Sequence, residues 1–169
     1  MAISQFNHIA YRCRDAAETT RFYEDVVGLP LAWAVTSDTV GSTGQHDPHI
    51  HIFFALPDGT FLAFFELLDR PPAQKDPNTP DWVQHISFTV SGHQELVDAK
   101  ARLEARGIKV LGPKSGHRFD SIYFFDPSGH RLEYTYCKQP MGPADAADAA
   151  KVLTAWQKRA AAKREKATQ

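Results

Sequence analysis

The chain has 169 residues, of which 43% are hydrophobic, so it is long enough and apolar enough for one domain with a substantial core. This composition excludes a disordered chain, a collagen and a disulfide scaffold. The 19 basic and 20 acidic side chains give a formal net charge of −1, so we expect neither a nucleic acid nor a membrane as partner. No apolar run approaches the roughly 20 residues that cross a bilayer, and none resembles a signal peptide, so we expect a cytoplasmic protein. The two cysteines, Cys13 and Cys137, form no CxxC motif and are expected to be free thiols.

The first half of the chain is predicted to contain one helix and four strands. His8-Ile9-Ala10-Tyr11 lies in a short alternating segment that indicates a strand. The helix that follows is expected to begin at a capping box formed by Asp15 and Glu18 and to end at Gly28. Strand-like runs then cover residues 31–35, 50–56 and 61–68. Residues 36–48, a polar stretch between the first two runs, are predicted to form a long loop.

The second half repeats this order. His85-Ile86-Ser87-Phe88 corresponds to the first strand, and a helix capped by Ser91 and Gln94 is expected to end at Gly107. Strand-like runs cover residues 108–111, 121–125 and 131–136, and in each half a Pro-x-Gly turn joins the last two runs. The sequence therefore predicts an α+β fold of two tandem βαβββ modules that form curved mixed sheets. The modules are residues 3–68 and 82–138 of one domain, 1–138, and the proline-rich segment 69–81 links them.

Residues 139–169 differ from the rest in composition and are predicted to form a helical tail. Pro143 suits the first position of a helix, and Val152, Leu153 and Trp156 give that helix one narrow apolar stripe. We expect this stripe to dock on the body or on another subunit. Between residues 144 and 169 there are six basic and three acidic side chains, so the tail carries +3 and the rest of the chain −4. We expect these charges to belong to a solvated helix end rather than to a nucleic acid arm.

Each half places a histidine in its first strand and a glutamate in its last, namely His8 and Glu66, then His85 and Glu133. A carboxylate in an apolar setting, such as Glu66 in FFELL, is costly to desolvate without a partner. A metal ion would partner all four side chains, and their recurrence at the same place in both halves favours that interpretation. Two imidazoles and two carboxylates suit Zn²⁺, Ni²⁺, Fe²⁺, Mn²⁺ or Co²⁺, so we predict one divalent metal ion without choosing which.

The two halves resemble the vicinal oxygen chelate superfamily, which includes glyoxalase I, extradiol dioxygenases, fosfomycin resistance enzymes and bleomycin resistance proteins. The resemblance rests on HIAYR, HISF, FFELL and IYFFDPSGHRLEY, and it covers about residues 3–136. It implies that the sheets enclose a metal-binding cavity, which takes a small-molecule substrate with two neighbouring oxygens. It also implies a homodimer, although the linker is long enough for the modules to pair within one chain or between two.

The metal ligands differ between members of this superfamily. Glyoxalase I-like enzymes use histidine, glutamate, histidine and glutamate, which correspond here to the four side chains named above. Extradiol dioxygenases use two histidines and one glutamate, which would be His8, His85 and Glu133. The segment IYFFDPSGHRLE is close to their signature, with Tyr123 at its tyrosine and His117 as its upstream histidine, although the spacing between these two is shorter than in the signature.

The register of the repeat bears on this choice. Glu133 lies four residues after Gly129, whereas Glu66 lies seven after Gly59, so strict register would put Ala63 at the ligand position. An odd offset reverses the strand face unless a bulge intervenes. If Glu66 is not a ligand, the two histidines and Glu133 remain, and the dioxygenase hypothesis gains.

Two further side chains are candidates for substrate binding. Arg12 shares a strand face with His8 and would present its guanidinium to the far end of a metal-bound substrate, as the corresponding arginine does in glyoxalase I. Alternatively, it pairs with Asp15 and is structural. His51, with its neighbours His46 and His49, would line the mouth of the cavity or carry protons, unless this segment is an exposed loop edge.

Three functions follow as hypotheses. The first is a glyoxalase-like isomerase or lyase, in which Glu66 or Glu133 moves a proton on a metal-bound substrate. The second is Fe²⁺-dependent extradiol cleavage of a catechol, assisted by Tyr123 and His117. The third is a non-catalytic drug-binding protein, which would not need the metal ligands.

Overall fold

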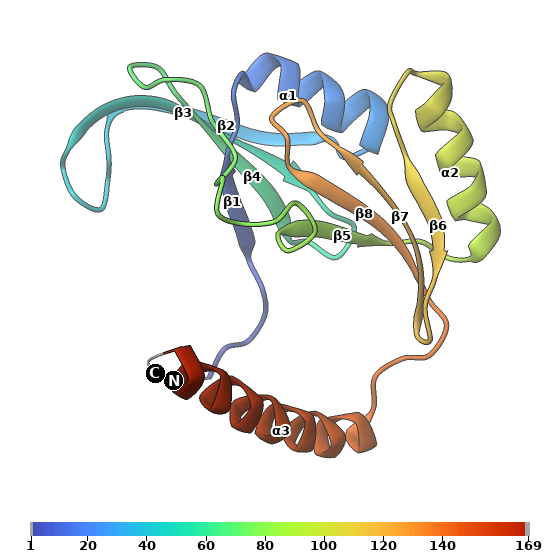
Figure 1. Ribbon diagram of the computed structural model, residues 1–169. Coiled ribbons are helices and arrows are strands. Elements are labelled where there is room, and N and C mark those ends of the chain that lie inside the picture. The colour runs from blue at the N-terminus through green and yellow to red at the C-terminus, as the bar shows by residue number, and fades with distance from the viewer. Residues whose placement is uncertain (1, 168–169) are drawn as a thin grey trace.

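The computed structural model describes residues 2–167 and contains two four-stranded sheets, each with a helix against one face, and a separate C-terminal helix (Figure 1). The first residue of the predicted domain, Met1, and the last two residues of the predicted tail, Thr168 and Gln169, lie outside the described residues. The predicted α+β fold of two βαβββ modules is confirmed. None of the helices within residues 2–167 is both long and apolar enough to cross a membrane.

The first sheet has the strand order β1-β4-β3-β2, with β1 parallel to β4 and the other pairs antiparallel. Its elements are β1 His8–Arg12, α1 Ala16–Phe22, the π-helical turn η1 Tyr23–Val27, β2 Leu31–Thr39, β3 His46–Ala55 and β4 Phe61–Leu67. The second sheet has the equivalent order β5-β8-β7-β6. Its elements are β5 His85–Thr89, α2 His93–Ala105, β6 Leu111–Ser115, β7 Phe119–Phe125 and β8 Arg131–Cys137, and α3 Pro143–Ala167 follows.

The signals at the ends of the first helix are confirmed. The Asp15 side chain accepts a hydrogen bond of 2.7 Å from the backbone N–H of Glu18, and Gly28 has a φ of +86° where the helix ends. The cap of α2 differs from the prediction. Ser91 donates to Glu95 rather than pairing with Gln94, and Gly92 is the N-cap. A carboxylate one turn into the helix therefore performs the capping that we assigned to the amide.

Several strand boundaries were predicted wrongly. Residues 36–39 and 46–48 are paired in the β2–β3 hairpin, so the predicted loop shrinks to residues 40–45. Pairing with the partner strand satisfies the backbone of this polar segment, which has no apolar periodicity to signal a strand. In the second module the predicted run 108–111 shares only Leu111 with the strand that the structure contains, because β6 covers Leu111–Ser115. The backbone N–H of Ile108 still bonds to the carbonyl of Leu103 and so completes the end of α2.

The core lies between the two modules, on the helix side of both sheets. Tyr23 is fully buried, packs against Phe54 and Phe64 of the first sheet, and donates through its hydroxyl to Asp126 of the second module at 3.2 Å. Buried side chains from both halves form one continuous cluster with it, including Leu96, Leu103, Ile122, Phe124 and Leu132. The helix-facing sides of the sheets are therefore filled within one chain.

The other side of each sheet, which we call its open face, is not covered in the same way. On the first open face Trp33 and Val35 are 57% and 40% exposed, and on the second Leu111 and Phe125 are 53% and 40% exposed. Because side chains alternate along a strand, His8 and Arg12 of β1 share the first open face, and His85 of β5 and Glu133 of β8 share the second. The predicted site residues of both modules lie on these faces, with the exceptions described below.

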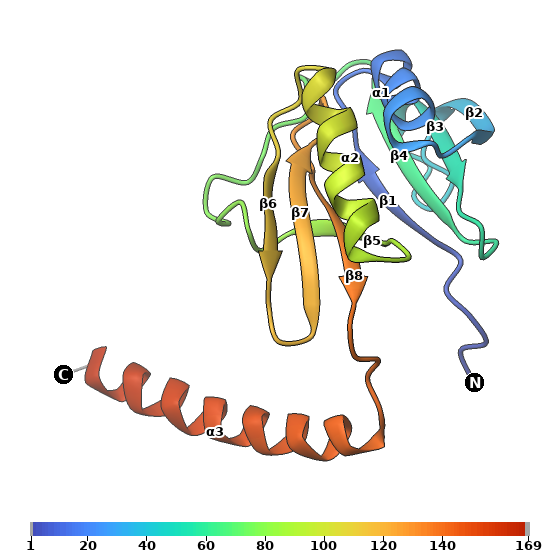
Figure 2. The ribbon, with the colours of Figure 1, turned by 90° about the vertical axis from the view of Figure 1, so that its right-hand side faces the viewer.

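The C-terminal helix α3 lies apart from both sheets (Figures 1 and 2). Arg118 holds its start by donating to the carbonyls of Gln139 and Pro140 and by pairing with Asp145. Val152, Leu153 and Trp156 remain 57–69% exposed, so the apolar stripe does not dock on the body of its own chain. Docking on another subunit stays a prediction.

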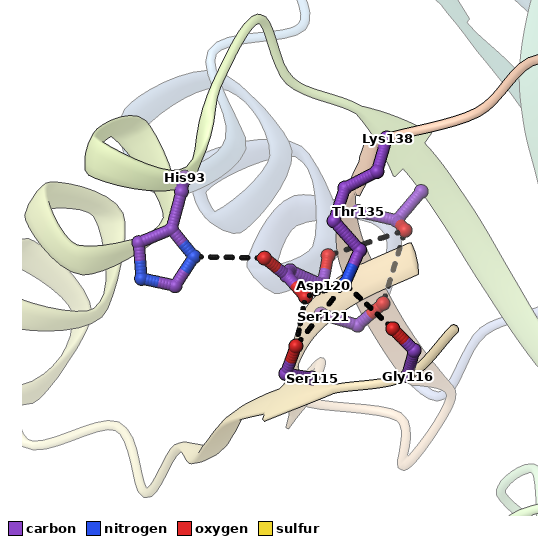
Figure 3. Close-up of polar contacts among 7 residues, drawn as sticks. All are labelled: His93, Ser115, Gly116, Asp120, Ser121, Thr135 and Lys138. Carbon is purple, nitrogen blue, oxygen red and sulfur yellow. Dashed lines mark hydrogen bonds and ion pairs between the residues drawn. The ribbon is translucent and has the colours of Figure 1, made fainter. Parts of the chain in front are cut away.

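A polar cluster around the buried Asp120 joins the far end of the second sheet to its helix (Figure 3). The carboxylate of Asp120 accepts hydrogen bonds from Ser115 at 2.6 Å and Lys138 at 2.8 Å, and pairs with His93, the first residue of α2, at 3.0 Å. The hydrogen bonds from Lys138 and Ser115 hold the pKa of this carboxyl well below its usual range. One carboxylate thus connects the β6–β7 hairpin, the end of β8 and the start of α2.

This connection predicts a pH-dependent loss of stability when Asp120 is replaced by asparagine. Because the folded-state pKa is depressed, the stabilisation is present above the unfolded-state value of about 4 and is lost progressively below it. The melting temperature of Asp120→Asn should therefore fall clearly below that of the wild type at pH 7, and the gap should narrow towards pH 3. Asp148→Asn, in an exposed pair with Lys151, is the control and should show no such trend. A gap for Asp120→Asn that is the same at every pH would contradict this account.

Candidate active site

The second open face carries a histidine and a carboxylate side by side. His85 opposes Arg131 and Ser87 opposes Glu133 in the parallel register of β5 and β8, which brings His85 and Glu133 together. The Nε2 atom of His85 lies 3.2 Å from Oε2 of Glu133. Glu133 is 8% exposed, whereas the His85 side chain is 36% exposed. One nitrogen donor and one oxygen donor therefore converge at a position open to solvent.

Tyr123 and Arg131 flank this pair. Tyr123 opposes Glu133 in the antiparallel register of β7 and β8, and the guanidinium of Arg131 lies 4.2 Å from the centre of the Tyr123 ring. Burial raises the pKa of Tyr123, and the carboxylate of Glu133 beside it raises that pKa further. The phenol is therefore protonated at neutral pH and able to donate a hydrogen bond beside the His85–Glu133 pair.

His8 and His51 lie together on the first open face, among aromatic side chains. The ring centre of His8 is 6.2 Å from that of His51 and 5.4 Å from that of Phe53, and His51 stacks on Phe65 at 3.6 Å. Burial lowers the pKa of His51 to about 4, so this imidazole is neutral at pH 7, and its Nε2 is buried without a hydrogen-bond partner. His8 is exposed, and its Nδ1 atom forms a hydrogen bond of 2.6 Å with Oδ1 of the neighbouring Asn7. This bond leaves the Nε2 atom of His8 available to a ligand.

Glu66 lies on the opposite face of the first sheet from His8. In β4 its neighbour Phe65 packs on His51 of the open face, so Glu66 points to the helix side. There its Oε2 accepts a hydrogen bond of 2.7 Å from the backbone N–H of Ala16, at the start of α1. The carboxylate thus satisfies a free N–H of the helix, and the structure does not bring it to the other three predicted ligands. No bulge in β4 restores the register.

His117 is also remote from the pair. It is an exposed residue in the turn between β6 and β7, two residues before Phe119, which pairs with Cys137 at the far end of the sheet. Tyr123 is four residues along β7 from Phe119, which corresponds to roughly 13 Å. Within residues 2–167 of one chain, no three side chains of histidine, cysteine, aspartate or glutamate are grouped closely enough to hold a metal ion. Of the four predicted ligands, His85 and Glu133 are the two that the described part of one chain brings into direct contact.

A pocket of about 220 Å³ opens beside this pair, where the end of β1, the start of β5 and the segment 69–81 meet. Arg12 of the first module and Arg131 of the second both line it, and the Nε atoms of both guanidinium groups are buried without a hydrogen-bond partner. The residues of segment 69–81 thus do more than link the modules, because they form one wall of the pocket. Arg131 is the residue of this site that our sequence reasoning missed. The signal was present, because Arg131 lies two residues before Glu133 and therefore on the same strand face.

The fold and the site define a protein of paired βαβββ modules with nitrogen and oxygen donors on the open faces of its sheets. The chain belongs to the Glyoxalase/Bleomycin resistance protein/Dioxygenase superfamily, whose family profile matches residues 5–134. The superfamily predicted from the sequence is confirmed.

Individual relatives are distant. The chain is 30% identical to the metallothiol transferase FosB of Bacillus licheniformis over 129 residues, 75% of this chain and 71% of the relative. It is 26% identical to glyoxylase I 4 of Arabidopsis thaliana over 140 residues, 80% of this chain and 72% of the relative. Among solved structures, a glyoxylase/bleomycin resistance protein/dioxygenase domain from Frankia sp. EAN1pec has a TM-score of 0.65 and is 19% identical, covering 81% of this chain and all of that domain. FosX of Listeria monocytogenes, solved with Mn(II) and sulfate, has a TM-score of 0.58 and is 21% identical, covering 80% of this chain and 93% of its own.

Proposed function

We propose that this protein is a divalent-metal-dependent enzyme that binds a small substrate through two neighbouring oxygens. The observation that carries the proposal is the His85–Glu133 pair, whose donor atoms converge 3.2 Å apart on an open sheet face. The relatives named metallothiol transferase and solved with Mn(II) support a metal-dependent activity of this kind. We further propose that the metal set is His8, His85 and Glu133, without Glu66.

The donor set fits a divalent transition metal. Two imidazoles and one carboxylate are the ligand types that Zn²⁺, Fe²⁺, Mn²⁺, Co²⁺ and Ni²⁺ share, and three protein ligands leave positions for two substrate oxygens. The Nε2 atoms of His8 and His85 have no fixed partner other than Glu133, so neither histidine must break a structural bond to bind the ion. When bound, the ion would act as a Lewis acid on the substrate oxygens.

We propose that His8 reaches this set from a second copy of the chain. The modules of one chain share a core on their helix sides, and neither open face covers the other. In a two-fold dimer, the first open face of one copy would lie over the second open face of its partner, and each of two equivalent sites would contain one His8, one His85 and one Glu133. The exposed Trp33 and Leu111 would be buried at the same time.

The residues of the site suggest which side chain would stabilise negative charge on the substrate and which would transfer a proton. Tyr123, protonated at neutral pH, would donate to negative charge that develops on a substrate oxygen, and Arg131 stacked on its ring would hold it in place. The site lacks Glu66 as a second carboxylate, so a glyoxalase-like lyase or isomerase would have to move its proton through Glu133. The absence of a second carboxylate supports an enzyme that activates its substrate for attack more than an enzyme that shuttles a proton between carbons.

A catechol dioxygenase is the second candidate. Two histidines and one glutamate are the facial set of non-haem Fe²⁺ oxygenases, and the position of Glu66 favours exactly three ligands. His117, which the resemblance to extradiol dioxygenases would make an assisting residue, is remote from the site.

Elemental analysis of the purified protein separates the candidate functions. Iron, with oxygen uptake and a yellow product on addition of catechol, would support the dioxygenase, and a protein that binds no metal would support a drug-binding role instead.

Mixing two inactive variants tests the shared site. His8→Ala and His85→Ala should each lose metal binding, because every site then lacks one imidazole. After the two are unfolded and refolded together, half of the dimers should combine one chain of each kind and contain one intact site. The mixture should therefore recover about a quarter of the wild-type metal capacity. A mixture that binds no more metal than the separate variants would exclude a site shared between chains.

A further inference from the structure

The C-terminal helix α3 carries a largely exposed apolar stripe, which consists of Val152, Leu153 and Trp156. We propose that α3 pairs with α3 of a second copy of this chain in antiparallel orientation, and that the stripe forms the contact between the two helices. The inference goes beyond the proposed function, because helix pairing requires neither a metal ion nor a substrate. It gives the stripe an occupant and an orientation.

The first argument is the exposure of the stripe. Its three side chains are 69%, 57% and 61% exposed, although they are the largest apolar side chains of α3. Ala149 and Ala160 extend the stripe by one turn on either side. Ten of the 25 residues of α3 are alanine, so the helix forms without help from the stripe. Large apolar side chains that helix formation does not require, gathered on one exposed face, indicate an interaction surface.

The second argument is that the start of α3 is fixed. Arg118 donates to the carbonyls of Gln139 and Pro140, and it pairs with Asp145. The second carboxylate oxygen of Asp145 accepts a hydrogen bond of 2.7 Å from the backbone N–H of Gly142. Figures 1 and 2 show that α3 runs apart from both sheets, at the end of the molecule opposite α1. The stripe is therefore presented to a second molecule and is not folded back onto its own sheets.

The third argument is the distribution of charge along α3. Asp145 and Asp148 lie in its first two turns, whereas five basic side chains and one acidic side chain, Glu165, follow Trp156. Asp148 also pairs with Lys151 of its own helix, in solvent-exposed contact. A parallel pair of helices would place like charges beside each other at both ends. An antiparallel pair places the acidic start of each helix beside the basic end of the other, so the charges are complementary.

The faces of the helix agree with the same orientation. Successive residues turn by about 100°, which places Asp145, Arg159 and Lys163 on one flank of the stripe. A two-fold axis that relates antiparallel helices brings each flank against the same flank of the other helix. In the register that puts Leu153 opposite Trp156, Asp145 of each helix lies beside Lys163 of the partner subunit. The apolar centre and the charged flank therefore match in one register.

The helix pair is compatible with the dimer proposed above. Both interfaces require a two-fold axis, so one dimer contains both when the two axes coincide. Three large apolar side chains from each helix make a small contact compared with a stable protein interface. We therefore expect the helix pair to strengthen a dimer that the open faces also hold.

Cross-linking of the metal-free protein tests the pairing and its direction. All variants carry Cys137→Ser, and Cys13 is buried, so the cysteines introduced into α3 are the ones that react. In the antiparallel register Ala149 of one helix faces Ala160 of the other, whereas the two copies of either position lie about 16 Å apart along the helix axis. A short bis-maleimide should therefore link the double variant Ala149→Cys/Ala160→Cys into covalent dimers. It should leave each single variant as a monomer on a denaturing gel.

Trp156→Ala measures the contribution of the stripe. Loss of both indoles from the centre of the contact should raise the dissociation constant of the dimer at least about tenfold, measured by sedimentation over a range of protein concentrations. Lys158→Ala is the matched control, because it shortens a long side chain on the opposite face of the same helix. It should change the constant by no more than about twofold.

Three results would overturn the helix pair. The double cysteine variant forms no covalent dimer, the single variants link as well as the double variant does, or Trp156→Ala dimerises like the wild type. A lipid surface as the occupant would give sedimentation with vesicles of phosphatidylcholine and phosphatidylglycerol that depends on Trp156, without cross-linking, and would also overturn it.

The helix pair and the proposed function fail separately. Absence of cross-linking in a protein that binds metal through His85 and Glu133 would overturn the helix pair alone. A double variant that cross-links while the wild type takes up no divalent metal would retain the helix pair and overturn the proposed function.

Discussion

Replacing Glu133 by glutamine is expected to reduce divalent-metal affinity at least about 100-fold, because it removes the carboxylate beside His85. The amide has the same size and is neutral, so the fold should persist while the anionic ligand is lost. Metal content after dialysis against a buffered metal solution measures the effect, and the circular dichroism spectrum checks the fold. Any metal-dependent turnover should fall in proportion to the lost metal.

Glu66→Gln is the matched control, because the same change is made in the equivalent strand of the other module. The glutamine carbonyl can still accept the hydrogen bond from Ala16, and the side chain faces away from His8. We expect metal affinity within about twofold of the wild type, since distant sites act independently. If Glu66→Gln lost metal as severely as Glu133→Gln, the three-ligand set would be wrong and the four-ligand set of the glyoxalase I-like enzymes would apply.

Replacing Tyr23 by alanine is expected to lower the free energy of unfolding by about 3–5 kcal/mol. The side chain is fully buried, its ring lies 5.1 Å from that of Phe54 and 5.0 Å from that of Phe64, and its hydroxyl reaches Asp126 of the other module. The substitution therefore leaves a cavity at the point where the two modules meet. Urea denaturation at a fixed protein concentration measures the loss.

Tyr23→Phe separates packing from the hydrogen bond. It keeps the ring and removes only the hydroxyl, and Asp126 still has the backbone and side chain of His130 as partners. The expected loss is therefore about 1 kcal/mol. A loss as large as that of the alanine variant would mean that the inter-module hydrogen bond, and not packing, dominates the stability of this junction.

The repeat could be predicted from the sequence because it depends on local patterns. Each of these patterns spans only a few residues: the alternation of a strand, the helix cap at Asp15, the helix-ending Gly28 and the Pro-x-Gly turn. The second copy has an alternating strand, a helix-ending glycine and a Pro-x-Gly turn at the equivalent places. The boundaries that failed were those without a local signal. The polar strand ends at residues 36–39 and 46–48 extend the β2–β3 pairing, which periodicity does not reveal.

For the site, the sequence indicated which residues are candidates better than it indicated which of them lie close together in the fold. The structure places five of the candidate residues on the open faces, namely His8, Arg12, His85, Tyr123 and Glu133. The seven-residue offset of Glu66 already warned that its face was reversed, and the structure places it at the start of α1. Arg131 was overlooked because its significance depends on Arg12 and segment 69–81, which are distant in sequence.

By itself the sequence determined the α+β class, the two modules and the shared strand face of His8 and Arg12, because periodicity and capping are local properties of a chain. Only the tertiary structure decided that the modules share a core on their helix sides, that Glu66 caps a helix, and that two arginines from different modules enter one pocket. The physical reason is that these contacts join residues far apart in the chain, and packing rather than spacing selects them.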